Sequence, residues 1–79
     1  DTYTKTINLL INLEDIDNNM IDALYHCINK SKGNVPVHFK VFDLKNNLDV
    51  QLVGTHKVNP VDFSINVKNI PKVGVKLTR

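Results

Sequence analysis

The sequence is poor in the residues from which metal and catalytic sites are built. It contains one cysteine and three histidines, and no C-x-x-C, H-E-x-x-H or H-x-x-H pattern occurs in it. His26 and Cys27 are neighbours on a segment that we expect to be helical, so their side chains point about 100° apart and cannot form an i, i+4 ligand pair. Cys27 fits the buried face of that helix. We therefore expect no metal, no cofactor and no catalytic residue in this chain.

Glycine and long apolar runs are also scarce. Gly33, Gly54 and Gly74 stand singly, which excludes a glycine-rich phosphate loop. One cysteine cannot form an internal disulfide, which is typical of a reducing compartment, and we expect a cytoplasmic protein. No apolar run approaches the ~20 residues that cross a bilayer, and no signal-peptide pattern is present, so we expect no membrane partner.

The composition is that of a small globular protein. Hydrophobic residues make up 42% of the 79 residues and charged residues 23%, which is enough for a single domain over residues 1–79 with one core. Because the chain opens with Asp1 and not Met, we expect it to be a fragment of a larger chain. Residues 1–29 are acidic and residues 30–79 basic. These charges either mix in the fold or form a basic face for an acidic partner; they are too sparse for a nucleic-acid patch.

The strongest element is a helix over residues 17–30. Its apolar residues recur on one helical face: Met20, Ile21, Leu24, Cys27 and Ile28. Asp15 and Asp17 can accept the free N–H groups of the first turn. Gly33 can adopt the left-handed conformation that closes a helix.

Alternation of apolar and polar residues predicts strands over residues 3–13, 35–42, 48–53 and 73–77. Pro36 cannot donate a ladder hydrogen bond, so it belongs near the start of its strand or on a sheet edge. The Asn46-Asn47 pair suits the turn between the second and third strands, and Gly54 can kink the chain or end the pairing.

Residues 61–67 fit two structures. Asn59 and Pro60 have the pattern of a helix start, whereas Val61, Phe63, Ile65 and Val67 alternate as a strand does. We expect a short helix over residues 60–68. The resulting β-α-β-β-α-β order predicts an α+β, ferredoxin-like fold, a four-stranded antiparallel sheet with both helices on one face.

The other face of that sheet is the candidate protein-contact surface. By alternation it carries apolar and basic side chains from three strands, namely Leu10, His38, Lys40, Phe42 and Val53. They are either scattered surface residues or a docking surface for a protein or for another domain of the parent chain. RNA-recognition domains of this topology stack bases on aromatic residues, and the predicted third strand has none, so we expect no direct nucleic-acid binding.

Several segments, in order and spacing, resemble the C-terminal domain of the bacterial DNA polymerase III alpha subunit. They are INLEDID at residues 11–17, IDAL at 21–24, KGNVPVHFKV at 32–41, VQL at 50–52, KVNP at 57–60, IPKV at 70–73 and KL at 76–77. The resemblance covers residues 7–78, and the Asn-rich and Lys-rich style resembles the Bacteroidetes-type branch. The sequence departs from the family pattern at residues 63–67, where the family usually has a helix rich in Leu and Glu.

The resemblance implies a non-catalytic protein-interaction domain. In this family the active site of the DNA-directed DNA polymerase lies far upstream in the parent chain. The C-terminal region helps to attach the polymerase to the clamp-loader tau subunit during DNA replication. The alternative, from the residues alone, is a small stand-alone α+β ligand-binding or sensor domain that dimerises through its sheet.

Overall fold

Seven elements follow one another in the computed structural model, which describes residues 4–78 apart from the side chain of Thr55. They are β1 (Thr6–Asn12), the 3-10 helix η1 (Leu13–Asp15), α1 (Asn18–Lys30), β2 (Lys32–Asp43), β3 (Leu48–Val58), α2 (Pro60–Val67) and β4 (Val73–Thr78). The predicted α+β class and the β-α-β-β-α-β order are confirmed. The segment after Asn59 is a helix, as expected.

The sheet has four strands in the order β3-β2-β1-β4. β1 and β2 are parallel neighbours, while β2–β3 and β1–β4 are antiparallel. The predicted ferredoxin-like, all-antiparallel arrangement is therefore wrong. Two adjacent parallel strands need a crossover connection, which α1 supplies. Alternation indicates which face of a strand is buried, but not the direction of the neighbouring strand. It therefore could not distinguish an all-antiparallel sheet from this mixed one.

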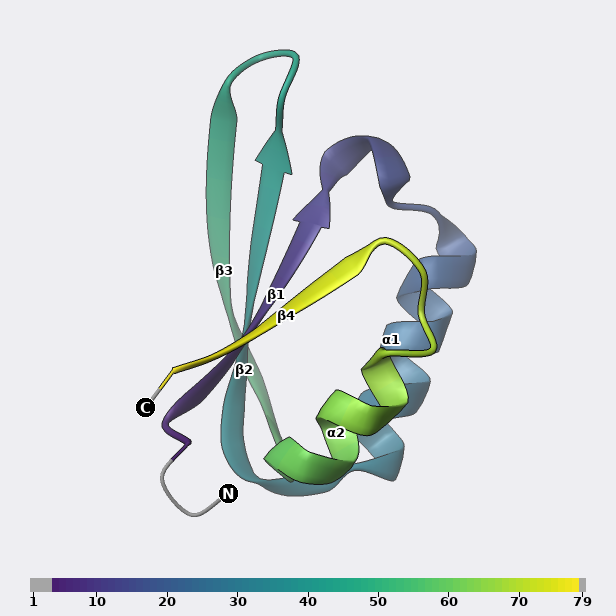
Figure 1. The fold of residues 1–79 in the computed structure, drawn as a ribbon, viewed down its shortest axis with the longest axis vertical. Helices are drawn as coiled ribbons and strands as arrows, with labels where there is room; N and C mark the ends of the chain where they lie inside the picture. The colour runs from purple at the N-terminus through teal and green to yellow at the C-terminus, as the bar shows by residue number, and fades with distance from the viewer. Residues whose placement is uncertain (1–3, 79) are drawn as a thin grey trace.

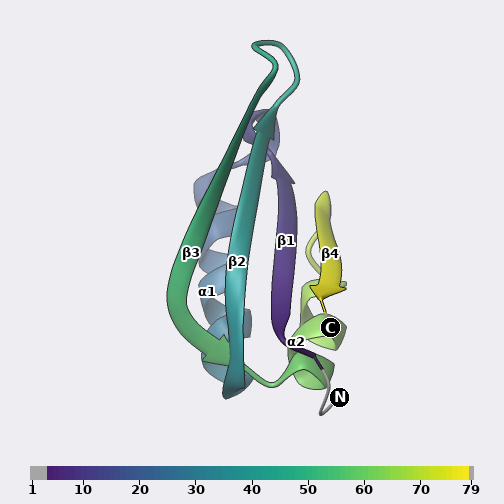
Figure 2. The same ribbon diagram turned by 90° about the vertical axis from the view of Figure 1, so that its left-hand side faces the viewer.

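Both helices cover the same face of the sheet, as predicted (Figure 1). Figure 2 looks onto the other face, which no helix of the described residues covers, with α1 behind β2 and β3 and with α2 behind the lower end of β1. The β2–β3 hairpin extends beyond both helices in these views. One face of the sheet is therefore open, and the helix side is only partly covered.

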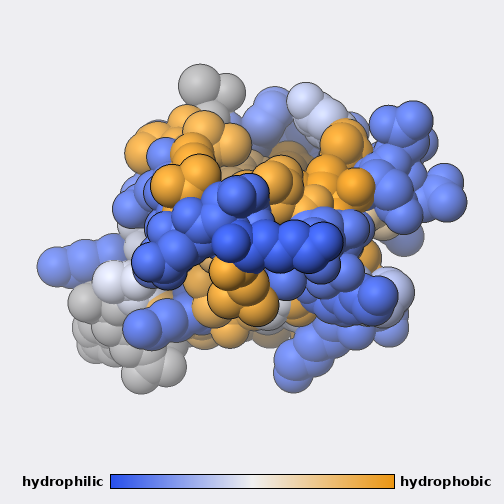
Figure 3. Space-filling model, turned by 90° about the horizontal axis from the view of Figure 1, so that it is seen from above, coloured by the Kyte–Doolittle hydropathy of each residue, from blue (hydrophilic) through white to orange (hydrophobic). Residues whose placement is uncertain are grey.

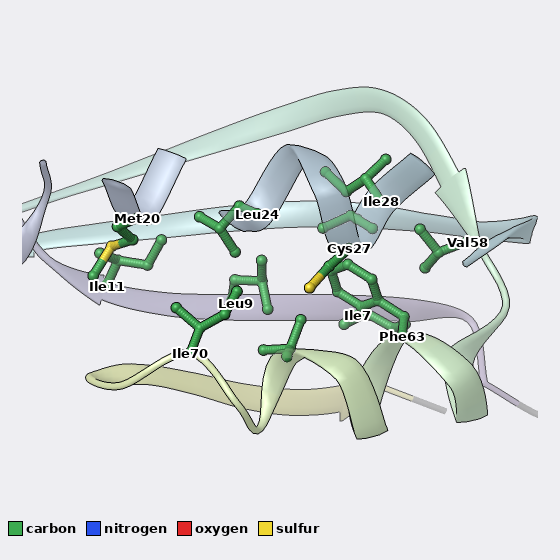
Figure 4. Packing of buried hydrophobic residues seen from close by; sticks show 12 residues of the cluster. Ile7, Leu9, Ile11, Met20, Leu24, Cys27, Ile28, Val58, Phe63 and Ile70 are labelled. Carbon is green, nitrogen blue, oxygen red and sulfur yellow. The ribbon is translucent and has the colours of Figure 1, made fainter. Parts of the chain in front are cut away.

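The core forms where the helices meet the central strand β1. Ile7, Leu9 and Ile11 alternate along β1 and are buried. In Figure 4 Phe63 of α2 lies beside Ile7, with Cys27 of α1 next to it. The remaining buried hydrophobic residues are Met20, Leu24, Ile28, Val37, Val58, Val67 and Ile70. One row of three strand residues thus contacts both helices.

The start of α1 has one capping carboxylate. Oδ1 of Asp17 accepts a hydrogen bond from the backbone N–H of Met20 at 2.8 Å. Asp15 lies in η1 and forms an ion pair with Lys72, 3.5 Å apart, so only one of the two predicted caps serves α1. At the start of α2, Oδ1 of Asn59 accepts hydrogen bonds from the backbone N–H groups of Val61 and Asp62.

Gly33 does not close α1, contrary to the prediction. The backbone of Ser31 ends the helix by donating to the carbonyls of Cys27 and Ile28. Gly33 lies in β2 without a positive φ. A Cβ atom there would lie 2.6 Å from the carbonyl carbon of Val58, so glycine is needed for the close approach of two backbones.

The β2–β3 hairpin is closed by Asp43. Its carboxylate accepts hydrogen bonds from the side-chain amide and backbone N–H of Asn46 and from the backbone N–H of Lys45. The hydrogen bond from the Asn46 side chain is the main reason that the pKa of Asp43 is lowered. Asn47 adopts the left-handed conformation with φ 53°, in agreement with the predicted Asn-Asn turn.

We expect Gly33→Ala to lower the free energy of unfolding by about 1–3 kcal/mol, because the added methyl group would meet backbone and not a movable side chain. Chemical denaturation measures the loss. Gly74→Ala is the matched control, since its Cβ would lie 3.3 Å from the Cβ of Leu10 and should cost less than about 1 kcal/mol. Equal stabilities for the two variants would show that the backbone contact at Gly33 is absent.

We expect Asp17→Ala to destabilise the protein by about 1 kcal/mol, because it removes the acceptor of the Met20 N–H. Asp22→Ala is the control, since it removes an exposed carboxylate from the interior of the same helix. Thermal unfolding of the two variants checks the difference. A loss for Asp22→Ala as large as that for Asp17→Ala would point to net charge and not to capping.

Candidate interaction surface

The five residues predicted for a contact surface lie on the open face of the sheet. Leu10 of β1 is directly opposite Lys40 of β2, and His38 of β2 is opposite Val53 of β3. Phe42 continues the row of β2 on the same face. Lys40 and Val53 are exposed, whereas Leu10, His38 and Phe42 are half-buried. The structure brings all five to one face, although it does not make them one apolar patch.

The apolar members of this surface are separated by polar neighbours. Phe42 lies between Asn12 of β1 and Asp49 of β3, so it has no apolar residue directly opposite it. The side chain of Val53 is 70% exposed. Leu10, Phe42 and Val53 are therefore separate apolar residues on a mixed surface, the first of the two alternatives given by the sequence.

The open face carries more bases than acids. Lys40 of β2 and Lys76 of β4 lie on it, and Asp49 of β3 lies on it as well. Glu14 and Asp15 lie in η1, and Asp17 caps the start of α1. Two of them form exposed or half-exposed ion pairs, Glu14 with Lys45 and Asp15 with Lys72, which contribute little stability. These two pairs join acids of the first part of the chain to bases of the second, so the charges mix around η1, whereas the open face keeps Lys40 and Lys76.

The sequence did not reveal a groove on the other side of the sheet, between α1 and the β2–β3 hairpin. Its volume is about 510 Å³, and hydrophobic residues supply most of its lining. Ile21 and Tyr25 of α1 form one wall, Phe39 of β2 lies in the floor, and Leu52 and Gly54 line the β3 side. Figure 3 shows hydrophobic surface exposed at the hairpin end of the molecule, beside the hydrophilic side chains.

The groove continues into an exposed row on β3. Leu48, Val50 and Leu52 occupy the helix-facing positions that alternation predicted, yet they are 59%, 52% and 53% exposed. Length explains why: α1 has 13 residues and spans about 20 Å, whereas β2 has 12 residues and spans about 40 Å. The sequence predicted only residues 35–42 for this strand, so the difference in length, and with it the exposed row, was not evident from the sequence.

The one cysteine and the histidines are the residues of this chain that could carry nucleophilic or acid–base chemistry. Burial raises the pKa of the Cys27 thiol, and nearby Lys30 only partly opposes this, so the thiolate is disfavoured. The rings of Tyr25 and His56 meet edge to face, with centroids 6.2 Å apart, at the side of the groove. Among residues 4–78, no three His, Cys, Asp or Glu side chains are grouped as metal ligands.

Comparison with known proteins identifies the family. The family model described as DNA polymerase III alpha subunit, C-terminal domain, matches residues 7–69, which is most of the chain. The searches of curated proteins and of solved structures gave no match. No helix in the described part of the chain is long and apolar enough to cross a membrane. The matched range contains the segments from Ile11 to Pro60 that carry the resemblance, and the chain therefore belongs to the family formed by the C-terminal domains of DNA polymerase III alpha subunits.

Proposed function

We propose that this domain is a non-catalytic attachment module of the replicative polymerase, which helps to join the alpha subunit to the clamp-loader tau subunit during DNA replication. The observation that carries the proposal is the family match over residues 7–69. Membership of a polymerase family favours this attachment role over the alternative of a stand-alone sensor domain.

The chemistry of the chain supports a binding role. Its one cysteine is buried and has a raised pKa, which is the reverse of what a nucleophilic thiol needs. Its exposed apolar side chains include Leu48, Val53 and Tyr25. Exposed apolar residues beside charged ones are typical of protein contact surfaces.

The proposed contact with tau is the open sheet face, with Leu10, His38, Lys40, Phe42 and Val53 as contact residues. Strands hold these side chains at fixed spacings, so a partner would meet a rigid surface. Lys40 lies at the centre, between Leu10 of β1 and Gln51 of β3. The excess of bases on this face favours a tau segment that presents carboxylates next to apolar side chains.

Titration calorimetry of the 79-residue chain with tau tests the proposal. We expect wild-type chain to bind, and we expect Lys40→Glu to weaken binding at least about tenfold, because the reversed charge would face the partner at the centre of the contact. Lys68→Glu is the matched control. It makes the same charge change at the exposed end of α2, on the helix side, and should leave the affinity unchanged.

The outcomes separate the two parts of the proposal. Absence of binding by wild-type chain at high micromolar concentration would contradict the attachment to tau by this domain. Binding that Lys40→Glu and Lys68→Glu leave equally intact would keep the attachment and would contradict the open face as the contact. Circular dichroism of each variant confirms that the fold is retained.

A further inference from the structure

β3 is an edge strand whose outer side is unpaired. Among the described residues it pairs with β2 and with no other strand, and Figure 2 shows it as the outermost strand, at the left of the sheet. An edge strand presents alternate N–H and C=O groups that can pair with a further strand. β4, the other edge, has only six residues and carries an exposed lysine, Lys76.

The first half of β3 is regular and apolar on its helix side. Its pairing with β2 runs without interruption from Leu48 to Val53, and the irregularity in register comes only after Val53. The helix-side row of this segment is Leu48, Val50 and Leu52, each more than half exposed. Proteins usually protect such edges with proline, bulges or inward-pointing charges, and this row contains none of them.

We propose that a second copy of this chain pairs with this edge, antiparallel, about a two-fold axis at Val50. Residues that lie opposite each other in an antiparallel pair have side chains on the same face, so the axis must fall on a residue. An axis at Val50 sets Val50 against Val50 of the second copy. It sets Leu48 against Leu52 of the second copy, and the helix side becomes a continuous aliphatic row.

The open-face residues of β3 select this register over its neighbours. With the axis at Val50, the carboxylate of Asp49 lies opposite the amide of Gln51 of the second copy, which can donate a hydrogen bond to it. An axis at Gln51 would set Asp49 against the aliphatic Val53 of the second copy. An axis at Asp49 would set two carboxylates against each other, and like charges directly opposite are destabilising.

The proposed dimer is closed and weak. The pairing is isologous, because each copy contributes the same residues from Leu48 to Leu52, and it forms no open chain. Each copy contributes one short strand edge with three exposed apolar side chains, which is a small contact beside the ~1,600 Å² that a stable interface buries. Association is therefore expected in the micromolar range or weaker. The open faces and their lysines remain free, so the dimer does not depend on the proposed contact with tau.

Sedimentation equilibrium of wild-type chain and of two charge variants tests this proposal, over about 10 µM to about 1 mM, the range of weak affinities. Wild-type chain is expected to change from monomer to dimer across this range. Val50→Lys and Val50→Glu should each stay monomeric, with association at least about tenfold weaker, because each sets like charges against each other at the axis. An equimolar mixture of the two variants should recover the dimer.

Recovery in the mixture is specific to the axis at Val50, since only this axis sets residue 50 against itself. Val61→Lys is the matched control, because Val61 is an exposed valine on α2 and outside the paired segment from Leu48 to Leu52, and this variant should dimerise as wild type does. A wild-type chain that stays monomeric at about 1 mM would overturn the proposal. So would variants that associate as strongly as wild type, or a mixture that stays monomeric while both variants are folded by circular dichroism.

Discussion

The packing of both helices on one row of β1 is the constraint on which the rest of the structure depends. Ile7, Leu9 and Ile11 of β1 lie in one buried cluster with residues of both α1 and α2, and Phe63 is the large α2 side chain in it. A chain this short has little core to spare. The sheet is therefore well covered at its centre, and coverage declines toward the β2–β3 hairpin, which is longer than the helices beside it.

This uneven coverage gives the molecule two different surfaces. The open face is mixed and somewhat basic, with Lys40 and Lys76 among polar and isolated apolar residues. The helix side of the hairpin is a groove and an aliphatic edge, where Leu48, Val50 and Leu52 remain exposed. The family match identifies the chain as a C-terminal domain of a polymerase subunit, and the two proposed contacts use these surfaces separately, the first through charge and the second through strand pairing.

Much of the fold could be predicted from the sequence because its signals are local. Caps at Asp17 and Asn59 fix the two helix starts, and alternation fixes which strand residues face the helices. The parallel pairing of β1 and β2 could not be predicted, because it depends on which strands become neighbours. Gly33 was misread for a similar reason: its role is a contact with Val58, which is distant in the sequence. Alternation places the five candidate residues on one face of the sheet, where the structure has them, whereas the groove was missed, because its lining depends on where α1 lies in space relative to β2 and β3.

Amide hydrogen exchange of the dilute chain tests most directly whether β3 is an open edge on a sheet centred on β1 and β2. We expect the slowest exchange between Ile7 and Ile11, whose amides lie within a strand paired on both sides, and fast exchange at alternate positions from Leu48 to Leu52. Uniform protection from Leu48 to Leu52, as strong as that of β1 at the same low concentration, would mean that another part of the chain covers the edge, and it would contradict the account.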